Sequence, residues 1–111
     1  MITVAETGEF INKAKKLLSD EERCCLVTYL SKHPSSGVIM EGTGGIRKLR
    51  WARQGTGKSG GVRVIYYFHG EGIPLYVLTV YGKGDKDNLS AAERNELAKL
   101  VEILVGYWRN R

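Results

Sequence analysis

The sequence predicts an α+β domain: an antiparallel sheet with helices packed on one face, in the order β-α-α-β-β-β-α. Apolar residues recur at helical spacing near both ends of the chain. Between them, residues 37–84 hold 12 of the 14 glycines and three strand-like runs. The length of 111 residues suits one compact unit. We therefore expect a single domain over residues 1–111.

The N-terminal third predicts a short strand and two helices. Residues 2–5 form the strand, and apolar residues at helical spacing predict a helix over about 7–18. Ser19 followed by Glu22 is a capping box, which begins a second helix. Because Pro34 disfavours helical geometry in the residue before it, this helix should end near His33.

The middle of the chain predicts three strands, over residues 46–53, 62–69 and 75–81. The glycine-rich link 54–61 and the short link 70–74 favour hairpins, and hence an antiparallel meander. A second capping box, Ser90 with Glu93, begins the last helix. One stripe of that helix should face the core: Leu97, Leu100, Val101, Leu104 and Trp108.

Positive charge is concentrated in the centre of the chain. The net charge is +5, and residues 1–36 and 85–111 are each balanced. Residues 37–84 contain two acidic side chains and seven basic ones: Arg47, Lys48, Arg50, Arg53, Lys58, Arg63 and Lys83. Such a segregated patch favours a polyanion, nucleic acid first, as the partner. A merely solvated basic face is the alternative.

Hydropathy and the cysteine and histidine residues exclude several classes of protein. No apolar run is long enough to span a membrane, and the first residues lack the pattern of a signal peptide. Two adjacent cysteines, Cys24 and Cys25, provide no disulfide framework and too few ligands for zinc. His33 and His69 lie in no metal or triad pattern, so we interpret both as structural. We predict a cytoplasmic protein without metal or cofactor.

One segment looks like a phosphate-binding P-loop. It reads GTGKS over residues 55–59, but the motif needs a glycine at the position of Ala52. It also needs a following helix, and a strand is predicted there. The sequence therefore argues against a nucleotide triphosphatase, and the segment is interpreted as a glycine loop presenting Lys58.

Alternation along the strands predicts a cationic surface. Lys48 and Arg50 share one face of their strand and should be exposed, whereas Leu49 and Trp51 should be buried on the other. If the strands are neighbours, four cations converge near a tyrosine: Lys48, Arg50, Arg63 and Lys83. Such groups hold phosphate oxygens, and an aromatic ring stacks on an extruded base. The alternative is that the tyrosines belong to the core.

The chain resembles the RelE/ParE superfamily of bacterial toxins, in its HigB-type branch. Three runs carry the resemblance: GTGGIRKLR at 42–50, GKSGGVRVIYYF at 57–68 and LTVYGK at 78–83. The order of helices and strands also matches, more weakly, over the rest of the chain. The resemblance implies a RelE-like fold and the toxin of a type II toxin–antitoxin system.

The resemblance also implies an activity and partners. Nuclease members of the family cut mRNA in the ribosomal A site and so inhibit translation. A ribose 2′-hydroxyl attacks its own 3′ phosphate, without a metal, giving a 2′,3′-cyclic phosphate and a free 5′-hydroxyl. The implied partners are mRNA, the ribosome and a cognate antitoxin. That antitoxin is often a helix-turn-helix protein, and DNA is contacted only through it.

Residue by residue, the resemblance implies a catalytic cluster. Arg63 matches the arginine that braces the scissile phosphate, on a strand surface where we expect it to be exposed. This chain has Gly84 where the family has an arginine, and Leu89-Ser90 where it has a tyrosine, which Tyr81 would replace. The other catalytic candidates are Lys48, Arg50 and Lys83, and the RNA-binding candidates are Arg47, Arg53, Lys58 and Tyr67. Which group is acid and which is base stays open.

Two other functions compete with the nuclease. A ParE-like toxin poisons DNA gyrase, but such members lack the basic cluster, so the charge distribution argues against this function. A non-catalytic module that binds RNA or the ribosome would keep the cations for phosphate contacts alone.

Overall fold

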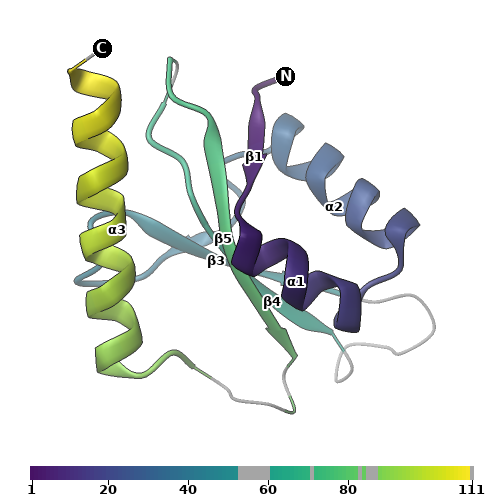
Figure 1. Cartoon of the computed structure of the whole chain (residues 1–111). Helices are drawn as coiled ribbons and strands as arrows, with labels where there is room; N and C mark the ends of the chain where they lie inside the picture. Colours follow the sequence, from purple (N-terminus) through teal and green to yellow (C-terminus); the bar gives the residue numbers. More distant parts are fainter. Residues whose placement is uncertain (53–60, 71, 83, 85–87, 111) are drawn as a thin grey trace.

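The computed structural model describes residues 1–52, 61–70, 72–82, 84 and 88–110. In these residues, three helices and five strands follow one another in the order β1-α1-α2-β2-β3-β4-β5-α3. The helices are α1 (Gly8–Leu17), α2 (Asp20–Lys32) and α3 (Ala91–Arg109). Figure 1 shows α3 on one side of the sheet and α1 with α2 on the other. The α+β class is confirmed, with one strand more than expected.

The five strands form one mixed sheet in the order β1-β5-β4-β3-β2. Strands β3, β4 and β5 form the antiparallel meander that the short links predict. In contrast, β1 pairs with β5 in parallel, so the prediction of a purely antiparallel sheet was wrong. The hairpin argument does not apply to β1, because some 70 residues separate it from β5 in the chain. The strand bounds are Val4–Glu6, Val38–Ile39, Ile46–Trp51, Val62–Tyr67 and Leu75–Gly82.

Side-chain caps fix where the helices begin. Ser19 Oγ accepts from the Glu22 amide at 3.1 Å, and Glu22 Oε1 accepts from the Ser19 amide at 2.8 Å. Ser90 and Glu93 form the same pair of bonds, at 3.1 and 2.9 Å, at the start of α3. Both predicted capping boxes are confirmed, and each satisfies two amides that a helix start leaves without partners.

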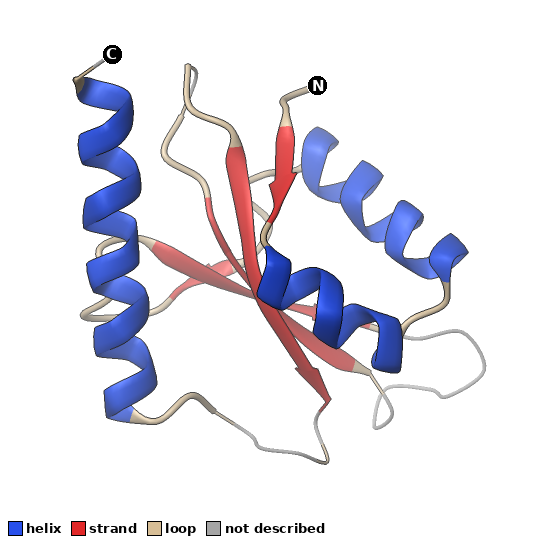
Figure 2. Cartoon of the chain, in the orientation of Figure 1, coloured by secondary structure: helices blue, strands red, loops and turns tan. Residues whose placement is uncertain are grey.

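Helices cover both faces of the sheet, so the expectation that they pack on one face was wrong (Figure 2). Strand β4 shows the reason, because apolar side chains alternate onto both of its faces and both must leave water. Val64 and Tyr66 join the core under α1 and α2. Ile65 and Tyr67 join a second core with Val101 of α3.

A bulge interrupts the β4–β5 ladder between Ile65 and Tyr66. Ile65 pairs with Thr79 whereas Tyr66 pairs with Val77, so Leu78 is the extra residue. Leu78 packs in the α3-side core. The α3-side core continues past the bulge, because Ile65 and Tyr81 belong to it, and Arg63 lies beside Tyr81 at its edge.

The outer face of α3 carries apolar residues. Leu100, which the helical stripe assigned to the core, is 37% exposed, and Ile103 and Tyr107 are more exposed still. Val101 is buried, so the stripe is narrower than predicted. Within the described residues, none of the helices has the length and apolar character needed to cross a membrane.

Candidate functional site

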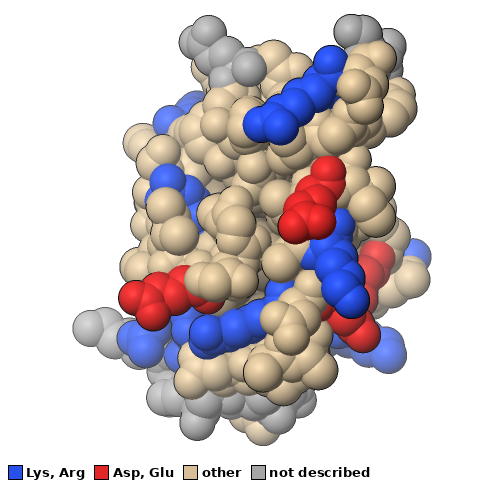
Figure 3. All heavy atoms as spheres, turned by 90° about the vertical axis from the view of Figure 1, so that its left-hand side faces the viewer, with Lys and Arg blue, Asp and Glu red and all other residues tan. Residues whose placement is uncertain are grey.

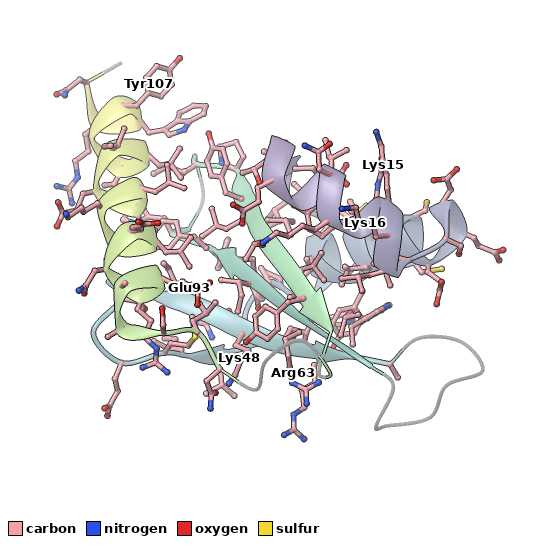
Figure 4. All side chains as sticks on the ribbon, turned by 60° about the horizontal axis from the view of Figure 1, so that its bottom comes forward. Lys15, Lys16, Lys48, Arg63, Glu93 and Tyr107 are labelled. Atoms are coloured by element: carbon pink, nitrogen blue, oxygen red, sulfur yellow. The ribbon has the colours of Figure 1, made fainter. Side chains whose placement is uncertain are left out.

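Three polar side chains form a row across the central strands. In the sheet register Arg50 of β3 lies directly opposite Arg63 of β4, and Arg63 lies directly opposite Tyr81 of β5. Residues paired in this way project from the same face, with Cβ atoms about 5 Å apart. Lys48 shares this face, two residues along β3 from Arg50. Figure 4 shows Lys48 and Arg63 below the sheet, and Lys15 and Lys16 of α1 on its other side.

The row is more buried than alternation predicts. Arg63 is 6% exposed, so the expectation of an exposed strand residue was wrong. The physical reason is its place on the central strand, where Arg50 on one side and Tyr81 on the other flank it. Tyr81 is itself buried, whereas Arg50 is exposed as predicted and Lys48 is half-buried. The site is therefore set into the sheet surface.

The two arginines of the row are like charges placed directly opposite each other, which destabilises a sheet. Within the described part of the chain, no carboxylate forms an ion pair with either of them. The ion pairs found there lie elsewhere, between Lys13 and Glu9 (3.7 Å) and between Arg23 and Glu6 (3.0 Å). An anion bound between Arg50 and Arg63 would relieve this repulsion.

A pocket adjoins the row at the end of β3 and the start of β4. Its volume is about 280 Å³, and its lining residues are Arg50, Trp51, Ala52, Gly61 and Arg63. The two guanidinium groups can therefore reach a phosphate in the pocket. Planar guanidinium groups bind phosphate oxygens through two parallel hydrogen bonds, which suits them to this ligand.

Asn88 positions the lysine of the site. The Lys48 ammonium donates to Asn88 Oδ1 at 2.9 Å, across 40 residues of sequence. Asn88 lies just before the capping box that begins α3. Sequence reasoning missed this residue, because only the tertiary fold brings the segment before α3 to β3.

A comparison with known protein families shows the family of this chain. Residues 4–110 match the family model described as the RelE toxin of the RelE/RelB toxin–antitoxin system. The chain belongs to the RelE toxin family. It is accordingly the toxin of a toxin–antitoxin module, and an antitoxin is its partner. The HigB-type branch stays a prediction.

Two of the predicted RNA-binding residues of this RelE toxin lie apart from the row. Arg47 alternates to the α1–α2 face, where its Nη1 donates to the carbonyl oxygens of Ser35 (3.1 Å) and Gly37 (2.7 Å). Tyr66 binds the same turn, accepting from the Gly37 amide and donating to the Pro34 carbonyl, each at 2.8 Å. Arg47 therefore holds a turn, and the structure does not bring it to the other cations.

Tyr67 lies in the RelE toxin's second core, at the end of the sheet that α3 covers. It is 5% exposed, and its hydroxyl forms a 2.9 Å hydrogen bond with His69 Nδ1. Burial raises the pKa of Tyr67 above its ordinary value of 10.0, and the nearby Arg109 partly opposes this shift. The alternative that the tyrosines belong to the core holds for Tyr67 and also for Tyr81, which is 4% exposed and packs in the same core.

Leu49 and Trp51 pack against the α1–α2 core as their parity predicts, although both are half-buried rather than buried.

Figure 3 looks onto the α3 side and shows basic side chains on several parts of this face, with acidic ones between them. Three candidates, Arg53, Lys58 and Lys83, lie outside the described residues, as does the whole segment 55–59 that resembles a P-loop. Among the described residues, no cluster of His, Cys, Asp or Glu is arranged to hold a metal ion.

Proposed function

We propose that this RelE-family toxin is an endoribonuclease that cleaves mRNA on the ribosome and thereby inhibits translation. The observation that carries the proposal is the row of Arg50, Arg63 and Tyr81, set beside Lys48 and a pocket that both arginines line. Two arginines without a carboxylate partner in the described chain suit an anionic substrate. RNA supplies such an anion at every nucleotide.

The proposed reaction needs only groups of the RNA and of the protein. The ribose 2′-oxygen loses its proton and forms a bond to the adjacent phosphorus, while the bond from phosphorus to the 5′-oxygen breaks. That oxygen gains a proton, so the products are a 2′,3′-cyclic phosphate and a 5′-hydroxyl. A proton acceptor, a proton donor and positive charge for the crowded phosphorane are required.

The described residues can be assigned to these roles. Arg63, with Arg50 opposite it, would hold the phosphate oxygens as negative charge builds on them. Lys48, held by Asn88, and Tyr81 are the candidates for proton transfer, in an order that the proposal leaves open. Lys83, which follows β5 in the sequence, is a further candidate cation.

Primer extension on a cellular message after toxin induction tests the proposal. We expect discrete new ends within the coding region in cells expressing the parent toxin, and none in cells expressing Arg63→Gln at equal levels. A gyrase poison would instead leave messages uncut and accumulate broken DNA. A non-catalytic ribosome-binding module would halt translation without new ends. Growth arrest with intact messages would overturn the nuclease.

A further inference from the structure

Trp51 lies where the candidate site meets the opposite face of the sheet. It is the last residue of β3, follows Arg50 directly, and lines the pocket with Arg50 and Arg63. Its side chain is half-buried and packs against the α1–α2 core. The pocket thus draws its lining from both sides of the strand end, with cations on one side and an indole on the other.

Two further aromatic rings continue from Trp51 along α2. The centroid of the Tyr29 ring lies 5.3 Å from that of Trp51, with the planes tilted by 57°. The His33 ring follows at 4.8 Å from Tyr29, tilted by 43°. Tyr29 is half-buried and His33 is exposed, so the cluster leads from the pocket to the surface. Tyr29 braces the indole from the side of α2.

The edge of β3 beside this cluster has no strand partner in the described part of the chain. Strand β2 pairs with Arg47 and Lys48, and its pairing stops there. From Leu49 to Trp51, β3 has a partner on the β4 side only. An extended strand lying along this edge can place a phosphate near Arg50 and reach Trp51 with the adjoining base.

We propose that Trp51, braced by Tyr29, is a stacking platform for a nucleobase of single-stranded RNA next to the phosphate held by Arg50 and Arg63. The proposal rests on the proposed function, because it adds a base subsite to that substrate. Aromatic rings beside a cationic groove are how proteins hold single strands with little sequence preference, since every base has a π-face. We therefore expect Trp51 to add affinity rather than sequence discrimination.

The two tryptophans of the chain allow a direct test. Trp108 lies at the other end of the sheet, where its Nε1 donates to the Tyr76 hydroxyl at 2.9 Å. The variant Trp108→Phe leaves Trp51 as the fluorophore, and Trp51→Phe leaves Trp108. The probe is a dye-labelled RNA hexamer with 2′-O-methyl riboses, which 2′-hydroxyl attack cannot cleave. Anisotropy of the dye measures binding, and tryptophan emission reports stacking.

We expect the hexamer to quench Trp51 in the Trp108→Phe variant and to leave Trp108 emission unchanged in the Trp51→Phe variant. Trp51→Leu should weaken binding by about tenfold, whereas Trp51→Phe, which keeps a ring, should largely retain it. Circular dichroism of each variant confirms that it is folded. Equal affinities of a folded Trp51→Leu variant and the parent would contradict the platform.

The outcomes separate this proposal from the proposed function. Binding of the hexamer without a change in Trp51 emission overturns the platform and leaves the nuclease intact. Absence of any binding at low salt also overturns the platform, and primer extension on the same variants then decides whether the nuclease stands. Quenching of Trp51 in a protein that leaves messages uncut would retain the platform and favour the RNA-binding module.

Discussion

The α3 side of the sheet has two ends that the same strands form, and these ends differ in their effect on stability. At one end, α3 covers Tyr67, whose hydroxyl is hydrogen-bonded to His69. At the other end, Arg50 and Arg63 face each other and a pocket. The covered end gains stability from burial. The open end loses stability through like-charge repulsion and keeps its cations available for an anion.

The paired arginines indicate a functional site, because they lower the stability of the fold where they lie. A sheet position on a central strand is ordinarily apolar, and β4 is apolar at every position except Arg63. Residues that destabilise a protein are retained where activity needs them. Substitutions at the open end should therefore change activity much more than stability, and those at the covered end should do the reverse.

The largest effect is expected at Arg63. Arg63→Gln should reduce cleavage about 100- to 1,000-fold, because a transition-state contact to the phosphate is lost. Arg63→Lys should restore part of it, since an ammonium keeps the charge without the planar fork of donors. The measurement is the cleavage rate on programmed ribosomes. Lys16→Gln, which removes a charge from α1 on the other side of the sheet, is the control and should cleave at the parental rate.

The second prediction concerns the covered end. Tyr67→Phe removes the hydrogen bond to His69 and should lower the free energy of unfolding by about 0.5–1.5 kcal/mol. Because Tyr67 is buried away from the row, the cleavage rate should stay within about twofold of the parental rate. Urea unfolding and the ribosome assay measure the two quantities. A large loss of cleavage in a stably folded variant would return Tyr67 to the RNA site.

A smaller effect of opposite sign is expected at Arg50. Arg50→Gln removes one of two like charges on directly opposite residues and should raise the free energy of unfolding by about 0.2–1 kcal/mol at low salt. The gain should shrink as salt screens the repulsion. RNA binding should weaken at the same time. A folded Arg50→Gln protein that is less stable at every salt concentration would mean that the arginines do not repel.

The smallest expected effect is a pH dependence at the covered end. Burial raises the pKa of Tyr67 in the folded state, so the folded protein holds the phenolic proton more tightly than the unfolded chain does. The corresponding stability is fully present below pH 10 and is lost as the pH rises through the folded-state value. Stability should therefore fall less between pH 9 and 11 in Tyr67→Phe than in the parent, as measured by urea unfolding. Parallel curves would contradict this.

Much of the fold was predictable because its signals are local. The capping boxes at Ser19 and Ser90 and the glycine-bounded strands depend on neighbouring residues only, and all are present. The parallel pairing of β1 with β5 was not predictable, because it joins distant segments. The second helical layer was missed for a similar reason: alternation in β4 shows two apolar faces but not which helix covers each.

The candidate site was predictable in its membership more than in its environment. Strand parity placed Arg50, Arg63 and Tyr81 on one face, and the register makes them direct neighbours. Strand parity shows which face a side chain is on but not how deeply it is buried. Arg63 was therefore expected on the surface, whereas it is only 6% exposed. Nor can parity find Asn88, whose contact with Lys48 depends on where the chain passes before α3.

The chemistry of the cut ends tests the central claim most directly. RNA fragments from ribosomes incubated with the parent toxin should carry 5′-hydroxyls and 2′,3′-cyclic phosphates. They should therefore enter 5′ ligation only after treatment with polynucleotide kinase and ATP. Arg63→Gln should yield such fragments about 100- to 1,000-fold more slowly. Fragments with 5′-phosphates, or fragments formed equally fast by a folded Arg63→Gln protein, would contradict a 2′-hydroxyl attack braced by this row.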